Sequence, residues 1–157
     1  MSVSEGDKAP AFSMATDGGG TLSLKDLKGK PVVLYFYPKD DTPGCTKQAC
    51  AYRDDLQKFQ DAGVKLFGVS MDDIASHDAF QSKFSLNFPL LCDPEHKLAD
   101  ALGVYGDHEV RGFKYTGLSR DTFLVSPEGK VTRVWRQVDP VSTSDETYAA
   151  AVAAKGG

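Results

Sequence analysis

Two cysteines five residues apart are the residues in this chain whose type and spacing best suit chemistry. Cys45 and Cys50 lie in the segment DDTPGCTKQACAYRDD, residues 40–55, and the third cysteine, Cys92, lies in another segment. The spacing is neither the C-x-x-C of a zinc site nor that of a dithiol redox motif. What each thiol can do therefore depends on the position that the surrounding sequence gives it.

Cys45 is expected at the N-cap or in the first turn of a helix. The turn residues TPG follow an apolar run at 31–37, and a helical apolar stripe begins soon afterwards (Ala49, Tyr52, Leu56 and Phe59). The unpaired N–H groups and the dipole of a helix N-terminus favour an anion, and the thiolate is the nucleophilic form of cysteine. Cys45 falls on the face of the stripe, so we expect it partly exposed at the rim of the core. The alternative is a small buried hydrophobe.

The other two cysteines differ in their expected surroundings. Cys50 lies about 140° around the helix from Cys45, so it leaves the apolar stripe and is expected to be more exposed. Cys92 closes the run FPLLCD and alternates with Leu90, so we expect it to be buried and inert.

The sequence offers little to a metal ion or to a cysteine–histidine hydrolase. A zinc site would need four ligands in closer pairs, an arrangement that the candidate ligands do not offer (Cys45, Cys50, Cys92, His77, His96 and His108). A hydrolase would need a histidine base near Cys45. His96 and His108 stay possible on spacing alone, but no local signature supports them. We expect surface positions for the histidines, and neither a metal nor a cofactor.

The elements that must position these residues follow an α/β order. We expect strands at 31–37, 64–70, 88–93 and 120–126, and a last strand at 131–138 that pairs antiparallel after the turn PEGK. We expect helices at 46–61, 73–84, 94–103 and 147–155, with Gly63 ending the first and Pro94 opening the third.

Two connections complete this order, a hairpin tip at 16–20 and a polar loop ahead of residue 120. The expected sheet has helices on both faces and an antiparallel edge. Cys45 follows the carboxyl end of a central strand, where open α/β sheets place their functional residues.

Composition and charge fit one globular domain over residues 1–157. The net charge of −4 and the pI of about 5.3 lack the basic footprint of a nucleic-acid-binding protein. No apolar run approaches the roughly 18 residues of a membrane span. The segment MSVSEGDKAP lacks the basic and apolar regions of a signal peptide. An odd number of cysteines without an export signal indicates a reducing compartment, so we expect a cytoplasmic protein.

The segment PKDDTPGCTKQAC, residues 38–50, resembles the active-site signature of the peroxiredoxins, in their peroxiredoxin Q or bacterioferritin comigratory protein branch. The likeness covers nearly the whole chain. GDKAPAFSM resembles the family's opening, FGVSMDD its second strand, FPLLCDPEHKLADALGVYG its third strand and following helix, and SRDTFLVSPEGKV its late strand pair. The resemblance implies a thioredoxin-like fold with a central mixed sheet, helices on both faces and an N-terminal hairpin extension. It also implies a thiol-dependent peroxidase of antioxidant defence that reduces hydrogen peroxide and organic hydroperoxides.

The same resemblance implies a role for each residue of the signature. Cys45 matches the peroxidatic cysteine, whose thiolate attacks the peroxide and becomes a sulfenic acid. Thr42 matches the threonine that orients the peroxide, and Pro43 matches the proline that shields the sulfenate. Arg120 matches a strand arginine whose permanent charge stabilises the thiolate and the breaking O–O bond. Without the resemblance, Arg120 could equally form a surface ion pair.

Cys50 matches the resolving cysteine of those relatives that place it five residues downstream. This implies an intramolecular Cys45–Cys50 disulfide, which thioredoxin or a similar dithiol reduces. Other relatives carry the resolving cysteine in the next helix, near residues 80–83, where this sequence has none, and Cys92 is then the only rival. The branch suggests a monomer, with neither nucleic acid nor a membrane as a partner. Two other interpretations stay open: a redox sensor that signals through Cys45, and a thioredoxin-like domain whose thiols serve only packing.

Overall fold

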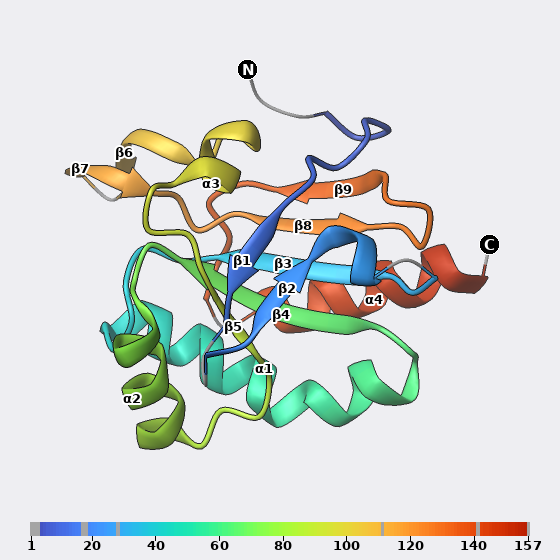
Figure 1. Ribbon diagram of the computed structural model, residues 1–157, viewed down its shortest axis with the longest axis horizontal. Coiled ribbons are helices and arrows are strands. Elements are labelled where there is room, and N and C mark those ends of the chain that lie inside the picture. Colours follow the sequence, from blue (N-terminus) through green and yellow to red (C-terminus); the bar gives the residue numbers. More distant parts are fainter. Residues whose placement is uncertain (1–3, 17–18, 28, 111, 141, 157) are drawn as a thin grey trace.

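A five-stranded mixed sheet forms the centre of the computed structural model, which describes residues 4–16, 19–27, 29–110, 112–140 and 142–156. The strand order is β5 (Leu90–Cys92), β4 (Lys65–Ser70), β3 (Val32–Phe36), β8 (Thr122–Val125) and β9 (Val131–Trp135). β4 runs parallel to both β3 and β5, whereas β8 is antiparallel to both β3 and β9 (Figure 1). The predicted mixed sheet with an antiparallel edge is confirmed, and β3 is its central strand.

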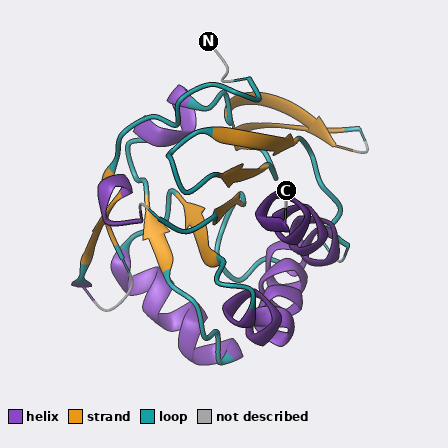
Figure 2. Ribbon diagram, turned by 90° about the vertical axis from the view of Figure 1, so that its right-hand side faces the viewer, coloured by secondary structure: helices purple, strands orange, loops and turns teal. Residues whose placement is uncertain are grey.

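β3 is buried on both faces because its apolar residues alternate between two cores. Val33, Tyr35 and the following Tyr37 belong to one core, and the residues between them belong to the other. The first core is closed by α1 (Pro43–Asp61), α2 (Ile74–Phe84) and α4 (Thr143–Gly156). Figures 1 and 2 show these long helices gathered on one side of the strands.

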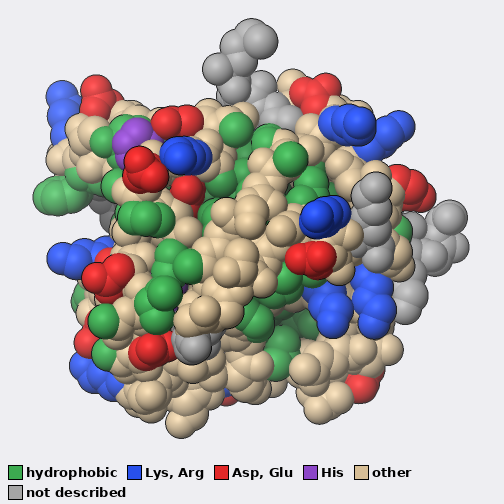
Figure 3. Space-filling view, in the orientation of Figure 1, with side chains coloured by type: hydrophobic (Ala, Val, Ile, Leu, Met, Phe, Trp, Pro, Cys, Tyr) green, Lys and Arg blue, Asp and Glu red, His purple; other side chains and the backbone are tan. Residues whose placement is uncertain are grey.

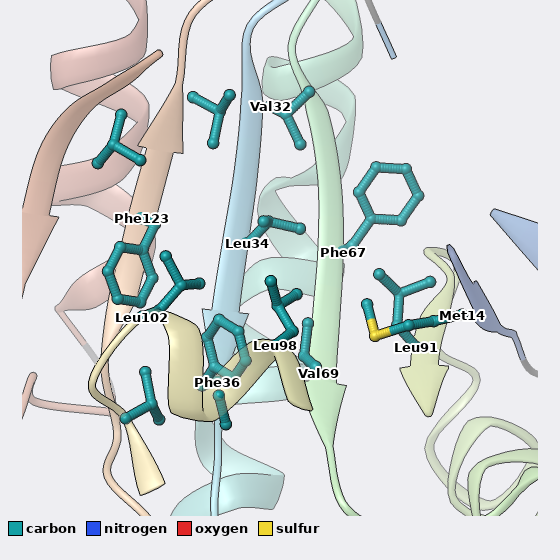
Figure 4. Packing of buried hydrophobic residues seen from close by; sticks show 14 of the residues in the cluster. Met14, Val32, Leu34, Phe36, Phe67, Val69, Leu91, Leu98, Leu102 and Phe123 are labelled. Atoms are coloured by element: carbon teal, nitrogen blue, oxygen red, sulfur yellow. The ribbon is translucent and has the colours of Figure 1, made fainter. Parts of the chain in front are cut away.

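Shorter elements cover the opposite face of the sheet. They are α3 (Lys97–Ala101), the 3-10 helix η2 (Leu24–Leu27) and the antiparallel hairpin of β1 (Ser13–Ala15) and β2 (Thr21–Ser23). In Figure 4, Leu98 of α3 lies over the β3 side chains, and Met14 of β1 lies beside Leu91 of β5. Helices on both faces and an N-terminal hairpin are therefore confirmed. The predicted hairpin tip at 16–20 joins β1 to β2, although residues 17 and 18 lie outside the described part of the chain.

Helix α1 begins three residues before the predicted start because proline can occupy the first position of a helix. Thr42 is the N-cap residue, and Pro43 takes the next position. Gly63 follows the C-terminal end with a φ of 75°, as the sequence predicted. The side chain of Asp73 caps α2 by accepting a hydrogen bond from the Ser76 amide at 2.9 Å.

Several expected elements differ in the structure: α4 begins at Thr143 rather than at 147, and β9 ends at Trp135 rather than at 138. The predicted polar loop ahead of residue 120 is an antiparallel hairpin of β6 (Tyr105–Val110) and β7 (Phe113–Leu118). Several of its residues are charged and most lie toward the surface, so they lack the alternation of apolar and polar residues that a strand facing the core would show. The predicted helix at 94–103 is shorter, since α3 begins only at Lys97 after His96 adopts a left-handed conformation. The side chain of Asp93, rather than Pro94, supports its start by accepting the Ala99 amide at 2.9 Å.

The surface carries charges of both signs. On the face seen in Figure 3, acidic and basic side chains are interspersed rather than gathered by sign. No helix in the described part of the chain combines the length and the apolar character that a bilayer crossing requires.

Candidate active site

Cys45 lies in the first turn of α1, where the helix N-terminus meets the carboxyl end of β3. It packs into the same core as Tyr35 and Tyr37, and only 1% of it is exposed. The predicted place in the first turn is confirmed, whereas the predicted partial exposure is wrong. The reason is that the first turn lies directly against the sheet, and the side chain of Arg120 lies beside the sulfur.

The guanidinium of Arg120 lies directly beside this sulfur. Its Nη1 donates to the Sγ of Cys45 at 3.6 Å and to the Oε1 of Gln48 at 3.0 Å. A permanent positive charge at this distance stabilises a thiolate over a thiol. The surface ion pair considered as the alternative is thus not the arrangement found.

Gly44 makes room for this guanidinium. A Cβ atom at residue 44 would lie only 2.8 Å from Nη2 of Arg120, well inside van der Waals contact. A side chain at this position would therefore require the guanidinium to shift from its place beside the sulfur.

Gln48 was missed by the sequence analysis. Its side chain is fully buried, and its Oε1 holds the Arg120 guanidinium. Its Nε2 has no hydrogen-bond partner among the described residues. The available signal was its spacing, because residues three apart on a helix face the same way as Cys45.

Thr42 and Pro43 stand at the start of α1, beside Cys45. The Thr42 hydroxyl donates to the carbonyl of Lys39 at 2.9 Å, which leaves its oxygen lone pairs available to a ligand. Pro43 is exposed at the first helical position. The structure thus gathers four of the predicted site residues, Thr42, Pro43, Cys45 and Arg120, at one helix end.

Cys50 lies on the same helix, half-buried, and it is not joined to Cys45 by a disulfide. The expectation that it leaves the apolar stripe is confirmed, since the α1 residues in the core include Cys45 and Ala49 but not Cys50. Because α1 is continuous through both cysteines, helix geometry separates their Cα atoms by about 8.6 Å. A disulfide spans at most about 7 Å, so the observed helix keeps the two thiols apart. Cys92 is buried at the end of β5, as predicted.

The histidines do not supply a base for Cys45. His96 contacts Asp100 at 2.8 Å, and His108 contacts the carbonyl of Val104 at 2.9 Å. His77 is fully buried, so the expectation of a surface position is wrong for it. The cause is a partner that the sequence did not reveal, the buried carboxylate of Asp40, 2.7 Å from His77 Nδ1.

A buried polar cluster surrounds His77. Burial alone lowers the pKa of His77, but the hydrogen bond and charge of Asp40 outweigh it, so the pKa is raised. Ligand atoms of Asp40, Asp72 and His77 lie within 4.8 Å of one another. The hydroxyls of Tyr37 and Ser76 also donate to Asp40, at 2.6 and 2.8 Å. Together these contacts form a buried hydrogen-bond network.

Comparison with known proteins agrees with this geometry. The pattern of the AhpC/TSA family matches residues 5–134. The chain is 49% identical over 138 residues to the putative peroxiredoxin bcp of Coxiella burnetii, covering 88% of this chain and 91% of that protein. It is 45% identical over 138 residues to the peroxiredoxin Bcp of Bacillus subtilis, covering 88% of each.

A solved structure gives the same assignment. The bacterioferritin comigratory protein of Xanthomonas campestris, which has alkyl peroxide reduction activity, superposes with a TM-score of 0.85 at 37% identity. The match covers 93% of this chain and 92% of that one. The chain therefore belongs to the AhpC/TSA family, as a peroxiredoxin of the Bcp and peroxiredoxin Q type with a thioredoxin-like fold.

Proposed function

We propose that this chain is a thiol peroxidase that reduces hydrogen peroxide and organic hydroperoxides through Cys45 and Cys50, with thioredoxin as the reductant. One observation carries the proposal: the Sγ of Cys45 sits in the first turn of α1, 3.6 Å from Nη1 of Arg120. A helix N-terminus and a fixed cation both favour the thiolate at this point.

In the first step, the Cys45 thiolate attacks the terminal oxygen of the peroxide. The S–O bond forms as the O–O bond breaks, and the leaving oxygen takes a proton to become water or an alcohol. Cys45 is oxidised to a sulfenic acid. Arg120 stabilises the negative charge that passes along the O–O bond, Thr42 orients the peroxide through its hydroxyl, and Pro43 shields the sulfenate from further oxidation.

In the second step, the Cys50 sulfur attacks the sulfenic acid sulfur. The S–S bond forms as the S–O bond breaks, and the hydroxyl leaves as water with the proton of the Cys50 thiol. A dithiol such as thioredoxin then supplies two electrons and two protons, becomes a disulfide itself and returns both cysteines to thiols. Since the intact helix holds the two thiols too far apart, this step requires the start of α1 to unwind.

The wider setting follows from the same chemistry. We propose one peroxiredoxin domain over residues 1–157 that acts as a monomer without a cofactor. A dithiol-driven cycle works in a reducing compartment, and we propose the cytoplasm. Neither nucleic acid nor a membrane is part of the proposal.

Steady-state peroxide consumption with a thioredoxin system tests the proposal. The wild type should turn over many equivalents with hydrogen peroxide and with an organic hydroperoxide, and Cys45→Ser should not react. Cys92→Ser is the matched control, since Cys92 is an equally buried thiol that the cycle does not use. A wild type that oxidises once but is not recycled would instead indicate a sensor, and one that never oxidises would leave the thiols a packing role.

A further inference from the structure

His77 is a fully buried titratable side chain that the proposed chemistry does not use. Its two ring nitrogens contact two different segments. Nδ1 lies 2.7 Å from Oδ2 of Asp40, in the loop between β3 and α1, and Nε2 lies 2.9 Å from the carbonyl oxygen of Leu91 on β5. One imidazole on α2 thus joins the loop ahead of the active site to the edge strand of the sheet.

The contacts require both nitrogens to carry protons when Asp40 is ionised. A carbonyl oxygen only accepts, so Nε2 donates to Leu91. Asp40 already receives the hydroxyls of Tyr37 and Ser76, which makes it an acceptor toward Nδ1 as well. His77 is then an imidazolium paired with a buried carboxylate. If Nδ1 loses its proton, its lone pair faces a lone pair of the Asp40 oxygen.

Asp40 fixes the loop that leads into Cys45. Its side chain holds His77, Tyr37 and Ser76, and its own amide donates to Oδ2 of Asp72 at 2.8 Å. Only two residues separate Asp40 from Pro43, the first residue of α1. The position of the first helical turn therefore depends directly on this anchor.

We propose that His77 is a positioning residue that anchors the loop before α1 and so holds the first turns of α1 in the helical form that reacts with peroxide. The inference rests on the proposed function, because it concerns the unwinding that the Cys45–Cys50 disulfide requires. Removal of the anchor shifts the reduced protein toward the unwound form, in which Cys45 is less well placed for peroxide and freer to meet Cys50.

The anchor is pH-dependent. Among the described residues, the charged groups that face His77 are Asp40 from the loop and Asp72 from the segment that follows β4, while β5 presents a carbonyl and burial keeps Tyr37 neutral by raising its pKa. The raised pKa of His77 means that the folded state binds its proton more tightly than the unfolded state does. The anchor is therefore complete below about pH 6.5, the ordinary value, and is lost as pH rises through the raised pKa.

Amide hydrogen exchange of the reduced protein tests this inference without any turnover. A negative result would therefore contradict this inference and leave the peroxidase proposal untouched. His77→Leu should speed exchange in residues 42–52 by about tenfold or more at pH 6, the effect expected for losing a hydrogen bond between charged groups. The ratio to wild type should shrink toward one as the pH rises through the raised pKa of His77, where the wild type loses the same proton. The comparison at each pH cancels the intrinsic pH dependence of exchange.

Two further variants make the test sharp. His77→Asn places an amide donor where Nδ1 stood but cannot titrate, so it should exchange more slowly than wild type above the raised pKa of His77 and not at pH 6. His96→Asn is the matched control, because His96 forms the same Nδ1 contact with Asp100 at 2.8 Å at the exposed start of α3, and it should leave residues 42–52 unchanged. Equal exchange in wild type and in both His77 variants, or a variant-to-wild-type ratio that does not change with pH, would overturn the inference. If His77→Leu does not fold, the reversal expected for His77→Asn decides alone.

Discussion

Formation of the Cys45–Cys50 disulfide must unwind the N-terminal part of α1. Residues five apart on a helix are separated by about 7.5 Å along the axis and by a rotation of about 140°, which together place their Cα atoms about 8.6 Å apart. A disulfide tolerates at most about 7 Å. The bond and the continuous helix from Pro43 to Asp61 therefore exclude each other.

The structure sets both limits of the unwound segment. On one side, Asp40 holds the preceding loop in its buried network. On the other, the Tyr52 hydroxyl lies within hydrogen-bond distance of Thr147, at 3.2 Å, and of Thr143, at 3.4 Å, on α4. We therefore expect about nine residues to leave the helix, from Pro43 to just before Tyr52, nearly half of the 19 residues of α1.

The cost of this opening is moderate. The first turn of a helix has few internal hydrogen bonds to lose. The bond from Arg120 to Gln48 breaks, at about 1.5–3 kcal/mol for a charged donor. In return, the buried Nε2 of Gln48, which lacks a partner among the described residues, gains water and recovers about 1–3 kcal/mol. The two side-chain effects nearly offset each other, so the cost of unwinding is mainly that of the backbone hydrogen bonds of these residues.

Far-UV circular dichroism and amide exchange measure the effect. The oxidised protein should lose the signal of about nine helical residues, and exchange should speed up in residues 43–51 while the rest of α1 stays protected. Cys50→Ser treated with one equivalent of peroxide is the control, since it forms no intramolecular disulfide with Cys45 and should keep its helix. A structure with a Cys45–Cys50 disulfide and an unbroken α1 would refute the reasoning.

Four substitutions test the other parts of the site. Cys45→Ser should abolish peroxide reduction with the fold intact by circular dichroism, and consumption near the wild-type rate would remove Cys45 from the mechanism. Cys50→Ser should consume about one equivalent of peroxide, stall with thioredoxin and over-oxidise more readily; a Cys45–Cys92 disulfide found in the wild type by mass spectrometry would reassign the resolving role. Arg120→Met should slow the single-turnover oxidation of Cys45 by about a hundredfold to a thousandfold and slow its alkylation at neutral pH; unchanged rates would exclude a role for the arginine. Gly44→Ala should displace the guanidinium from the sulfur and slow the same oxidation step, because the new Cβ would lie 2.8 Å from Nη2. A wild-type rate would show that Arg120 reaches the sulfur in another conformation.

Sequence patterns predicted the elements whose burial is continuous or periodic. β3 was visible as a run of β-branched and aromatic residues, and α1 as an apolar stripe, because each buries a face that its own sequence reports. The β6–β7 hairpin was not visible, since a ribbon that is largely exposed places charged residues where a core strand would be apolar. The start of α3 was misplaced because it depends on Asp93, a residue outside the helix.

Predictions for the site residues were right where they followed from local periodicity and wrong where they depended on distant partners. Local sequence placed Cys45 in the first turn of α1 and Cys50 off the apolar stripe, because both positions follow from helical periodicity. The burial of Cys45 and the contact with Arg120 depend on residues 75 positions apart, and the burial of His77 depends on Asp40, 37 positions away. Such long-range partners leave no periodic signal in a single sequence. The resemblance to a known family predicted Arg120 as a site residue, whereas no expectation pointed to Gln48 or to the buried position of His77.

The contact of Tyr52 with α4 has a consequence for the state in which the start of α1 is unwound. The Ser144 hydroxyl on α4 also donates to Asp55 of α1 at 2.9 Å, so the second half of α1 is held over the sheet by more than one bond. With this half in place, Tyr35, Leu56 and Phe59 stay covered while the first half is open. The unwound chain then exposes a short loosened segment rather than the whole sheet face, which limits the apolar surface available for self-association.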